Sequence, residues 1–258
     1  TGLQNIALGY QAHYKGTNDK FNVAIGSGAM TDRATVSGDV QYSVAIGYQA
    51  LKKNGGDANV AIGREVLNNI SSNTGYNIAL GYNTLSNITT TSAEGDNIAI
   101  GHSSGRAITG SNNIALGRGA LNGACVDKNV AIGNEALKIT TGSNNIAIGY
   151  RAGEYVTNHS NTINIGYNTH GYDRDNSINI GNIFRHNGET GTTAIGDGID
   201  PVAGARVYLR GGGTSLAPLK IGSGTLKTTT EVGAIEFDGS HLYFTDSGGT
   251  RHQIAVVA

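Results

Sequence analysis

The sequence has little proline, cysteine or methionine and no tryptophan. Its two prolines, Pro201 and Pro218, both lie in the last quarter of the chain, so a long N-terminal stretch contains none. Proline removes a hydrogen bond from a sheet, and this proline-free stretch, rich in glycine and isoleucine, therefore favours continuous sheet. The single cysteine, Cys125, has no partner for an intramolecular disulfide, and we expect it to fill a small apolar space.

Charged residues are also scarce. They make up 14% of the chain, and the formal net charge is −1. A nucleic-acid-binding surface needs a surplus of Lys and Arg to neutralise phosphates, so we expect no nucleic-acid partner. No run of about 18 apolar residues occurs, so we expect no insertion into a membrane. The chain begins at Thr1 without a visible signal peptide, and we expect it to be a processed product or an excised segment.

A short motif, opened by a polar residue and closed by glycine, recurs through most of the sequence. Residues 5–9 (NIALG), 22–26 (NVAIG) and 59–63 (NVAIG) are three of its copies. Twelve copies follow one another at short and similar intervals, which identifies a repeat protein. The repeat glycines are Gly9, Gly26, Gly47, Gly63, Gly81, Gly101, Gly117, Gly133, Gly149, Gly166, Gly181 and Gly196.

Within the motif, large and small apolar residues alternate. Ile, Val or Leu stands on each side of a small residue, which is Ala in ten copies and Asn (Asn164 and Asn179) in two; Thr193 is the one exception at the larger positions. Alternation with a period of two is typical of a strand, and we expect the larger side chains to form its buried face. The small residue then faces the opposite side, where we expect another surface to approach closely.

The polar and glycine ends of the motif are typical of turns. Glycine reaches the backbone conformations of a sharp turn at little cost. The opening Asn, Ser or Thr is expected to cap a turn and to hydrogen-bond to its equivalents on stacked copies as a ladder. After the glycine, segments such as 48–51 (YQAL) predict a second short strand. A unit of about sixteen residues with two strands predicts one rung of a parallel β-roll, and about twelve stacked rungs share one core.

The motif resembles the head repeats of trimeric autotransporter adhesins, the YadA-like heads, over residues 5–199. That resemblance implies a homotrimeric β-roll in which three chains wind into one head, with small residues close to the shared axis. The rungs in this sequence are longer and more variable than those of the family, and we expect no membrane-anchor segment within these residues.

Residues 200–258 differ from the repeats and are predicted to form a separate small β cap or trimerisation segment, following a repeat domain of residues 1–199. Strands are expected at 232–237, 242–245 and 252–257, with a hairpin turn at Asp238-Gly239. Within it, residues 220–254, which contain GAIEFDG at 233–239 and YFTDSG at 243–248, resemble a module near the ends of bacteriophage tail-fibre and related virion proteins. We expect the whole segment to cover the open end of the roll, which would otherwise expose unpaired strand edges.

Three patterns that suggest chemistry are better explained by structure. Residues 101–105 (GHSSG) match a nucleophile-elbow pattern, but Gly101 is a repeat glycine. The residues His159, His170, Asp173 and Asp175 lack the spacing of a known metal site, and residues 173–176 lack the glycine and glutamate of a calcium loop. Glu65 and Glu135 lie several rungs apart, too far to act as a pair. We therefore predict no enzymatic activity, catalytic residue, metal site or cofactor.

Five tyrosines follow a repeat glycine, and we expect them to stack on neighbouring rungs along one edge. The alternative is surface recognition of sugar rings, which present an apolar face to an aromatic side chain. The loops at 31–41, 52–58, 68–76 and 86–96 are further candidates for recognition. The tyrosines are Tyr10, Tyr48, Tyr82, Tyr150 and Tyr167.

These observations predict an all-β, homotrimeric, non-enzymatic fibre segment that is structural and adhesive. The first hypothesis is an extracellular phage tail fibre or related virion appendage, whose partners are its own copies, other virion proteins and a host-surface glycan or protein. The alternatives are the head of a bacterial trimeric surface adhesin and a glycan-cleaving tail spike.

Overall fold

The computed structural model describes residues 4–15, 18–33, 40–54, 56–70, 75–88, 95–169, 174–187, 192–195, 207–209, 235–237 and 241–254. Within these ranges the chain is all-β, and none of them contains a helix, so no described segment is a helix able to cross a membrane. The chain divides into two compact units, Thr1–Tyr208 and Leu209–Ala258. The sequence placed this boundary after residue 199.

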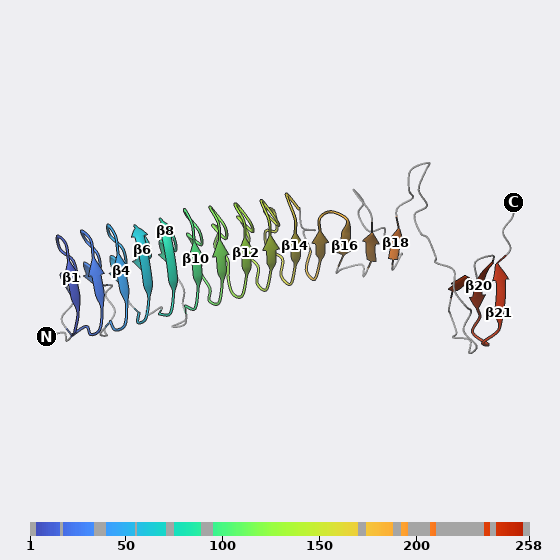
Figure 1. Ribbon diagram of the computed structural model, residues 1–258, viewed down its shortest axis with the longest axis horizontal. Helices are drawn as coiled ribbons and strands as arrows, with labels where there is room; N and C mark the ends of the chain where they lie inside the picture. The colour runs from blue at the N-terminus through green and yellow to red at the C-terminus, as the bar shows by residue number, and fades with distance from the viewer. Residues whose placement is uncertain are drawn as a thin grey trace. The chain divides into compact units, whose positions relative to one another are not determined.

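The first unit is a parallel β-solenoid in which eleven successive repeats each add one strand to the same sheet (Figure 1). Equivalent residues pair from strand to strand, as in the register of Ala24 with Ala45 and of Ala115 with Ala131. The parallel β-solenoid predicted from the repeat is thereby confirmed. Its parallel strands are β1 (Ile6–Leu8), β2 (Val23–Ile25), β4 (Val44–Ile46), β6 (Val60–Arg64), β8 (Ile78–Tyr82), β10 (Ile98–Ile100), β11 (Ile114–Leu116), β12 (Val130–Ile132), β13 (Ile146–Ile148), β14 (Ile163–Ile165) and β15 (Ile178–Ile180).

The twelfth repeat does not stack directly on the eleventh. Strand β16 (Phe184–Asn187) lies between them and pairs antiparallel with both β15 and β17 (Thr192–Ile195), the strand of the twelfth repeat. Strand β18 (Val207–Leu209) completes the fourteen-stranded sheet. The simple stacking expected of every repeat therefore holds for the first eleven.

The strands face the opposite way from the sequence prediction. The central Ala of the motif is fully buried from β2 to β13, as at Ala24, Ala61 and Ala131, and Asn164 and Asn179 take its place at 1% exposure. The Ile, Val and Leu residues beside it are all half-buried or exposed. A strand of three residues encloses a narrow roll, so the interior has room for Ala, and the larger side chains point outwards. The surface that approaches the Ala residues is the roll's own opposite wall.

That opposite wall is a turn rather than the second strand predicted directly after the glycine. Residues 48–51 turn through left-handed backbone at Gln49 (φ 53°) and Leu51 (φ 50°). Ala50 and Leu51 are fully buried, so the small-then-Leu pattern after the glycine does contribute to the core. A second parallel sheet of two-residue strands begins later in four of the repeats: β3 (Asp32–Arg33), β5 (Lys53–Asn54), β7 (Asn69–Ile70) and β9 (Asn87–Ile88).

The polar residues that open the motif form the predicted ladder of buried side chains. In its longest part, the Oδ1 atom of Asn97 accepts from the backbone N–H of Asn113 at 3.0 Å and from its Nδ2 at 3.0 Å. The Oδ1 atom of Asn113 accepts in the same way from Asn129, at 2.9 and 3.2 Å. These side chains are fully buried, so each amide satisfies groups that water does not reach.

The repeat glycines allow successive rungs to approach each other closely. From Gly9 to Gly166 their φ angles lie between 124° and 136°, a region that side chains rarely adopt. A Cβ atom built on Gly117 would lie 2.5 Å from the carbonyl oxygen of Gly133 on the next rung. Gly196 lies outside the described residues.

In the second unit, three antiparallel strands form a small sheet. They are β19 (Ile235–Phe237), β20 (Leu242–Thr245) and β21 (Arg251–Ile254), close to the three strands predicted from the sequence. Between β20 and β21, the Oδ1 atom of Asp246 accepts hydrogen bonds from the backbone of Gly248 and Thr250, at 2.9 and 2.8 Å. The predicted turn residues Asp238 and Gly239 lie outside the described residues.

Candidate interaction surface

The outer face of the parallel sheet carries two continuous columns of large apolar side chains, which we call the apolar stripe. None of them is buried, and several expose more than a third of their surface, including Ile100 (44%) and Ile148 (39%). At about 4.8 Å per strand, eleven strands extend the stripe over roughly 50 Å. The apolar stripe consists of Ile6, Leu8, Val23, Ile25, Val44, Ile46, Val60, Ile62, Ile78, Leu80, Ile98, Ile100, Ile114, Leu116, Val130, Ile132, Ile146, Ile148, Ile163, Ile165, Ile178 and Ile180.

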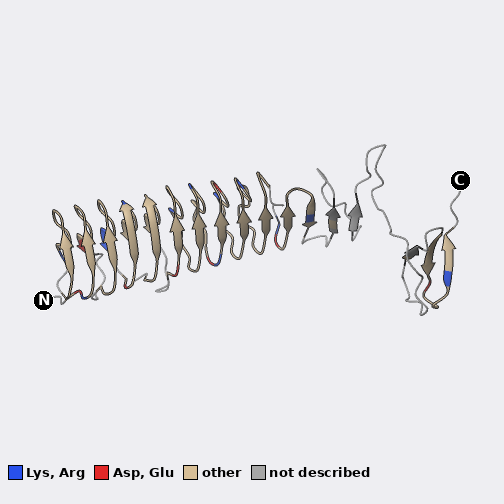
Figure 2. Ribbon diagram, in the orientation of Figure 1, with Lys and Arg blue, Asp and Glu red and all other residues tan. Residues whose placement is uncertain are grey.

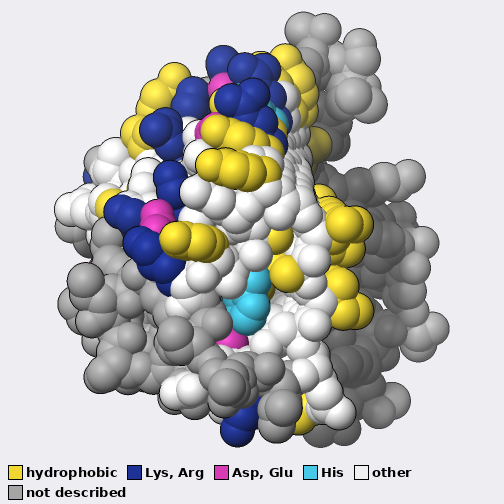
Figure 3. Space-filling view, turned by 90° about the vertical axis from the view of Figure 1, so that its left-hand side faces the viewer, with side chains coloured by type: hydrophobic (Ala, Val, Ile, Leu, Met, Phe, Trp, Pro, Cys, Tyr) yellow, Lys and Arg dark blue, Asp and Glu magenta, His cyan; other side chains and the backbone are white. Residues whose placement is uncertain are grey.

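Charged side chains are kept away from the apolar stripe. Arg64, at the end of β6, is the one charged residue within the eleven parallel strands, and most other charges of this unit lie in the connections (Figure 2). In a view along the row of strands, the hydrophobic side chains on the right-hand flank have no Lys or Arg among them, whereas those at the top and upper left lie beside Lys and Arg side chains (Figure 3). A contiguous exposed apolar surface of this length is typical of protein–protein or membrane interaction sites.

The tyrosines that follow the repeat glycines are exposed along one edge of this sheet. Tyr150 and Tyr167 stack on each other with ring centroids 5.2 Å apart, so the stacking between neighbouring rungs predicted from the sequence is confirmed for this pair. Tyr82 stacks in the same way on His102, also at 5.2 Å. Tyr10 and Tyr167 are the most exposed of the five, at 74% and 76%.

Arg64 contacts two of these tyrosines, and this contact was not predicted from the sequence, in which Arg64 only interrupts the tyrosine column. It follows a repeat glycine, like the tyrosines, and its guanidinium lies 5.7 Å from the ring centre of Tyr48 and 5.4 Å from that of Tyr82. A cation over an aromatic face is attracted by the ring's negative charge density. The sequence feature that could have predicted this contact is the position of Arg64 directly after a repeat glycine. Residues at that position in successive rungs lie next to one another, so Arg64 lies between Tyr48 and Tyr82.

The two glutamates at equivalent positions are engaged in separate ion pairs. Glu65 contacts Arg64 at 3.2 Å, and Glu135 contacts Arg151 at 2.8 Å and Lys138 at 3.2 Å. The hydrogen bond from Arg151 and then that from Lys138 lower the pKa of Glu135 below its ordinary value. Strands β8, β10 and β11 lie between the two glutamates, so the structure does not bring these carboxylates together.

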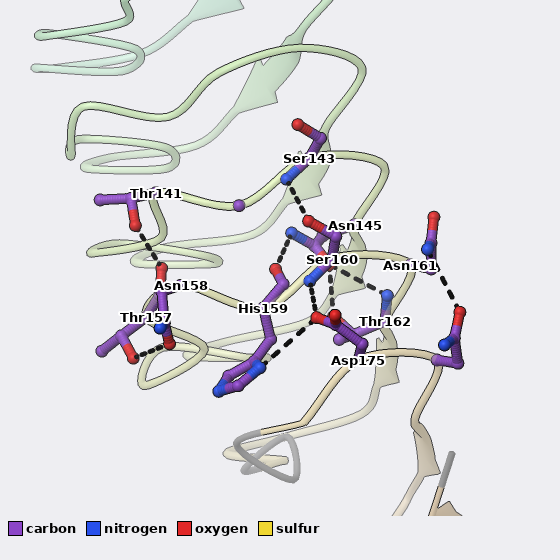
Figure 4. Close-up of polar contacts among 12 residues, drawn as sticks. Thr141, Ser143, Asn145, Thr157, Asn158, His159, Ser160, Asn161, Thr162 and Asp175 are labelled. Carbon is purple, nitrogen blue, oxygen red and sulfur yellow. Dashed lines mark hydrogen bonds and ion pairs between the residues drawn. The ribbon is translucent and has the colours of Figure 1, made fainter. Parts of the chain in front are cut away.

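Two of the four residues considered as a metal cluster do lie together. The Nδ1 atom of His159 is 3.4 Å from Oδ1 of Asp175, as Figure 4 shows. The same carboxylate accepts a hydrogen bond from the backbone N–H of Ser160 at 2.7 Å, which gives it a role in capping the turn. His170 and Asp173 lie outside the described residues, and the described part of the chain contains no cluster of three metal-binding side chains.

The nucleophile-elbow pattern lies in an ordinary turn of the solenoid. Its central residue, Ser103, has left-handed backbone (φ 53°), like the equivalent Gln49. The neighbouring Ser104 is fully buried, and its hydroxyl donates to the carbonyl oxygen of Ala115 at 2.7 Å. The strand-to-helix junction of a nucleophile elbow does not occur at this position.

Comparisons with known proteins identify no relative of this chain. No protein-family model matches the chain, no curated protein matches it, and no solved structure matches its fold.

Proposed function

We propose that this chain is a structural fibre segment that associates into a homotrimer through the apolar stripe and contacts a host surface. The observation that carries the proposal is the stripe itself, in which every rung from β1 to β15 leaves two large apolar side chains half-buried or exposed. Fully burying a wholly exposed side chain of this kind is worth roughly 1.5–3 kcal/mol. Each stripe residue gains a part of that on association, and the contributions of eleven rungs add along the stripe.

A second copy of the chain is the best-matched partner for the stripe. Its side chains repeat at the strand spacing of about 4.8 Å. A surface with the same repeat interdigitates with it along the whole length, and copies of this chain carry that repeat. The number of three copies, rather than two, follows from the resemblance of the motif to trimeric adhesin heads. In this proposal the Ile and Val columns face the shared axis, because the Ala residues are enclosed in each roll.

The proposed setting is an extracellular phage tail fibre or related virion appendage, from the resemblance of residues 220–254 to tail-fibre proteins. The head of a bacterial trimeric surface adhesin is the second candidate, favoured by the repeat motif. Both require a stiff rod that holds a contact surface away from its point of attachment.

Acidic substitutions in the apolar stripe test the association. The double variant Ile132→Glu and Ile148→Glu places charges within the proposed trimer core, and we expect light scattering to give a mass near the 26.6 kDa of one chain. Ile139 is 43% exposed but lies outside the stripe, so Ile139→Glu is the matched control and keeps the larger mass. An unchanged mass for the double variant contradicts association through this face.

A further inference from the structure

The column of residues that follow the repeat glycines is interrupted near its beginning, and the interruption opens a groove. Tyr10 and Tyr48 occupy this position after β1 and β4, whereas the repeat of β2 between them has Ser27. The groove has a volume of about 440 Å³, within the range of small-molecule sites.

The gap between the two tyrosines has room for one ring. Strand order places β2 between β1 and β4, so Tyr10 and Tyr48 are two strand spacings apart, roughly 9.6 Å. Where rings occupy neighbouring rungs, this protein stacks them at 5.2 Å, as with Tyr150 and Tyr167. A guest ring at the level of Ser27 would thus lie about 4.8 Å from each tyrosine, close to the 5.2 Å at which the protein stacks its own rings.

The walls and floor of the groove are supported by neighbouring residues. Arg64, from β6, lies over Tyr48 on the side away from β2 and leaves the other ring face to the groove. Gly28 and Thr31 also line the groove. A Cβ atom at Gly28 would lie 3.3 Å from the side chains of both Gln49 and Thr31, so a side chain at this position would be crowded.

The rim of the groove carries polar and charged groups. The side chains of Gln11 and Gln49 supply amide donors and acceptors. Lys15 donates to Asp32 at 2.7 Å, and this hydrogen bond is the largest cause of the lowered pKa of the Asp32 carboxyl. Lys52 also lines the groove. At neutral pH the groove thus presents two aromatic faces surrounded by hydrogen-bonding groups of both kinds.

We propose that this groove binds one pyranose ring of a saccharide between Tyr10 and Tyr48. A pyranose has two faces of C–H groups that stack on aromatic rings and a circumference of hydroxyls that the amides and the Lys–Asp pair recognise. The assignment deepens the proposed contact with a host surface, on which it rests, by naming a glycan as the contacted class.

The test uses the intact chain and four methyl glycosides, those of glucose, galactose, N-acetylglucosamine and glucuronic acid, with p-cresol as a planar aromatic. Saturation-transfer NMR is expected to detect at least one glycoside. Ser27→Tyr completes the tyrosine column and fills the gap, and Tyr10→Ala removes one wall. Each is expected to weaken binding at least tenfold. Asn134→Tyr adds the same ring at the equivalent position of a distant rung and is expected to leave binding unchanged.

The assignment would be overturned if no glycoside showed saturation transfer, or if p-cresol alone did. It would also be overturned if the Ser27→Tyr and Tyr10→Ala variants bound the glycoside as well as the unmodified chain does. The stripe variants, measured by mass, report separately on the fibre, so failure of the saccharide site is distinguishable from failure of the trimer.

Discussion

At the scale of single residues, glycine and asparagine have roles that their positions determine. The motif glycine is needed twice over, for its backbone angle and for the space that its missing side chain leaves to the next rung. In contrast, residues such as Gln49, Glu65 and Lys128 adopt left-handed backbone without being glycine (φ 53°, 56° and 60°). Such a conformation costs about 1–2 kcal/mol at each residue, and the stacked rungs on both sides hold it in place.

Substituting two different glycines by alanine compares a site where both the backbone angle and the space are restrictive with a site where there is room for a Cβ atom. Gly117→Ala combines an unfavourable φ of 129° with a clash against the backbone of Gly133, and we expect a loss of about 3–5 kcal/mol in unfolding free energy. Gly119 also has positive φ, 64°, but its added Cβ would meet only the Glu135 side chain at 3.7 Å. Gly119→Ala should therefore cost only about 1 kcal/mol in chemical denaturation. Equal losses would contradict the close contact between rungs.

Cys125 is expected to be inert in the folded protein and to make stability depend on alkaline pH. Burial raises the pKa of its thiol to about 12. The folded state thus keeps a proton that the unfolded state releases near pH 8.5, so stability is fully present below that pH and falls as pH rises towards 12. Chemical denaturation at a series of pH values measures this loss of stability, and in Cys125→Ala the part of the loss that comes from the thiol should disappear. The rate of thiol modification measures the reactivity of Cys125, and rapid modification of the native chain would count against its burial.

At the scale of elements, the alternation of residue size did not determine which face of a strand is the interior. By the rule that larger apolar residues are buried, Ile and Val were expected inside. The narrow roll instead encloses the small central residue, Ala or in two rungs Asn, beside the buried Leu of the turn. The small residue of the motif and the Leu four places after the glycine were both visible in the sequence. Their common role in one core depends on the turn geometry that brings them together. The insertion of β16 was not visible, because the spacing from Gly181 to Gly196 equals the one before it.

The asparagine ladder is predicted to be a main source of stability between rungs. Asn113→Ala removes the acceptor of the Asn129 N–H in a buried place, and leaving such groups without partners costs about 2–4 kcal/mol in unfolding free energy. Asn134 is half-buried at the turn, and Asn134→Ala is the control with an expected change below about 0.5 kcal/mol. Thermal unfolding followed by circular dichroism compares them. A similar midpoint for both variants would show that the ladder contributes little.

At the scale of the whole molecule, repetition turns a small local feature into a large surface. One rung exposes two apolar side chains, which is ordinary for a soluble protein, but eleven rungs in register align them into one stripe. The sequence predicted the solenoid and the polar ladder well, since both follow directly from the repeat. The exposed stripe and the groove at Ser27 required the observed strand orientation and strand order.

The native mass of the unmodified chain in solution, measured by sedimentation equilibrium, tests the central claim most directly. If the apolar stripes of three copies pack together, the mass is three times the 26.6 kDa of one chain over the micromolar range. A single species of 26.6 kDa throughout that range would contradict the trimer and leave the stripe to a different partner.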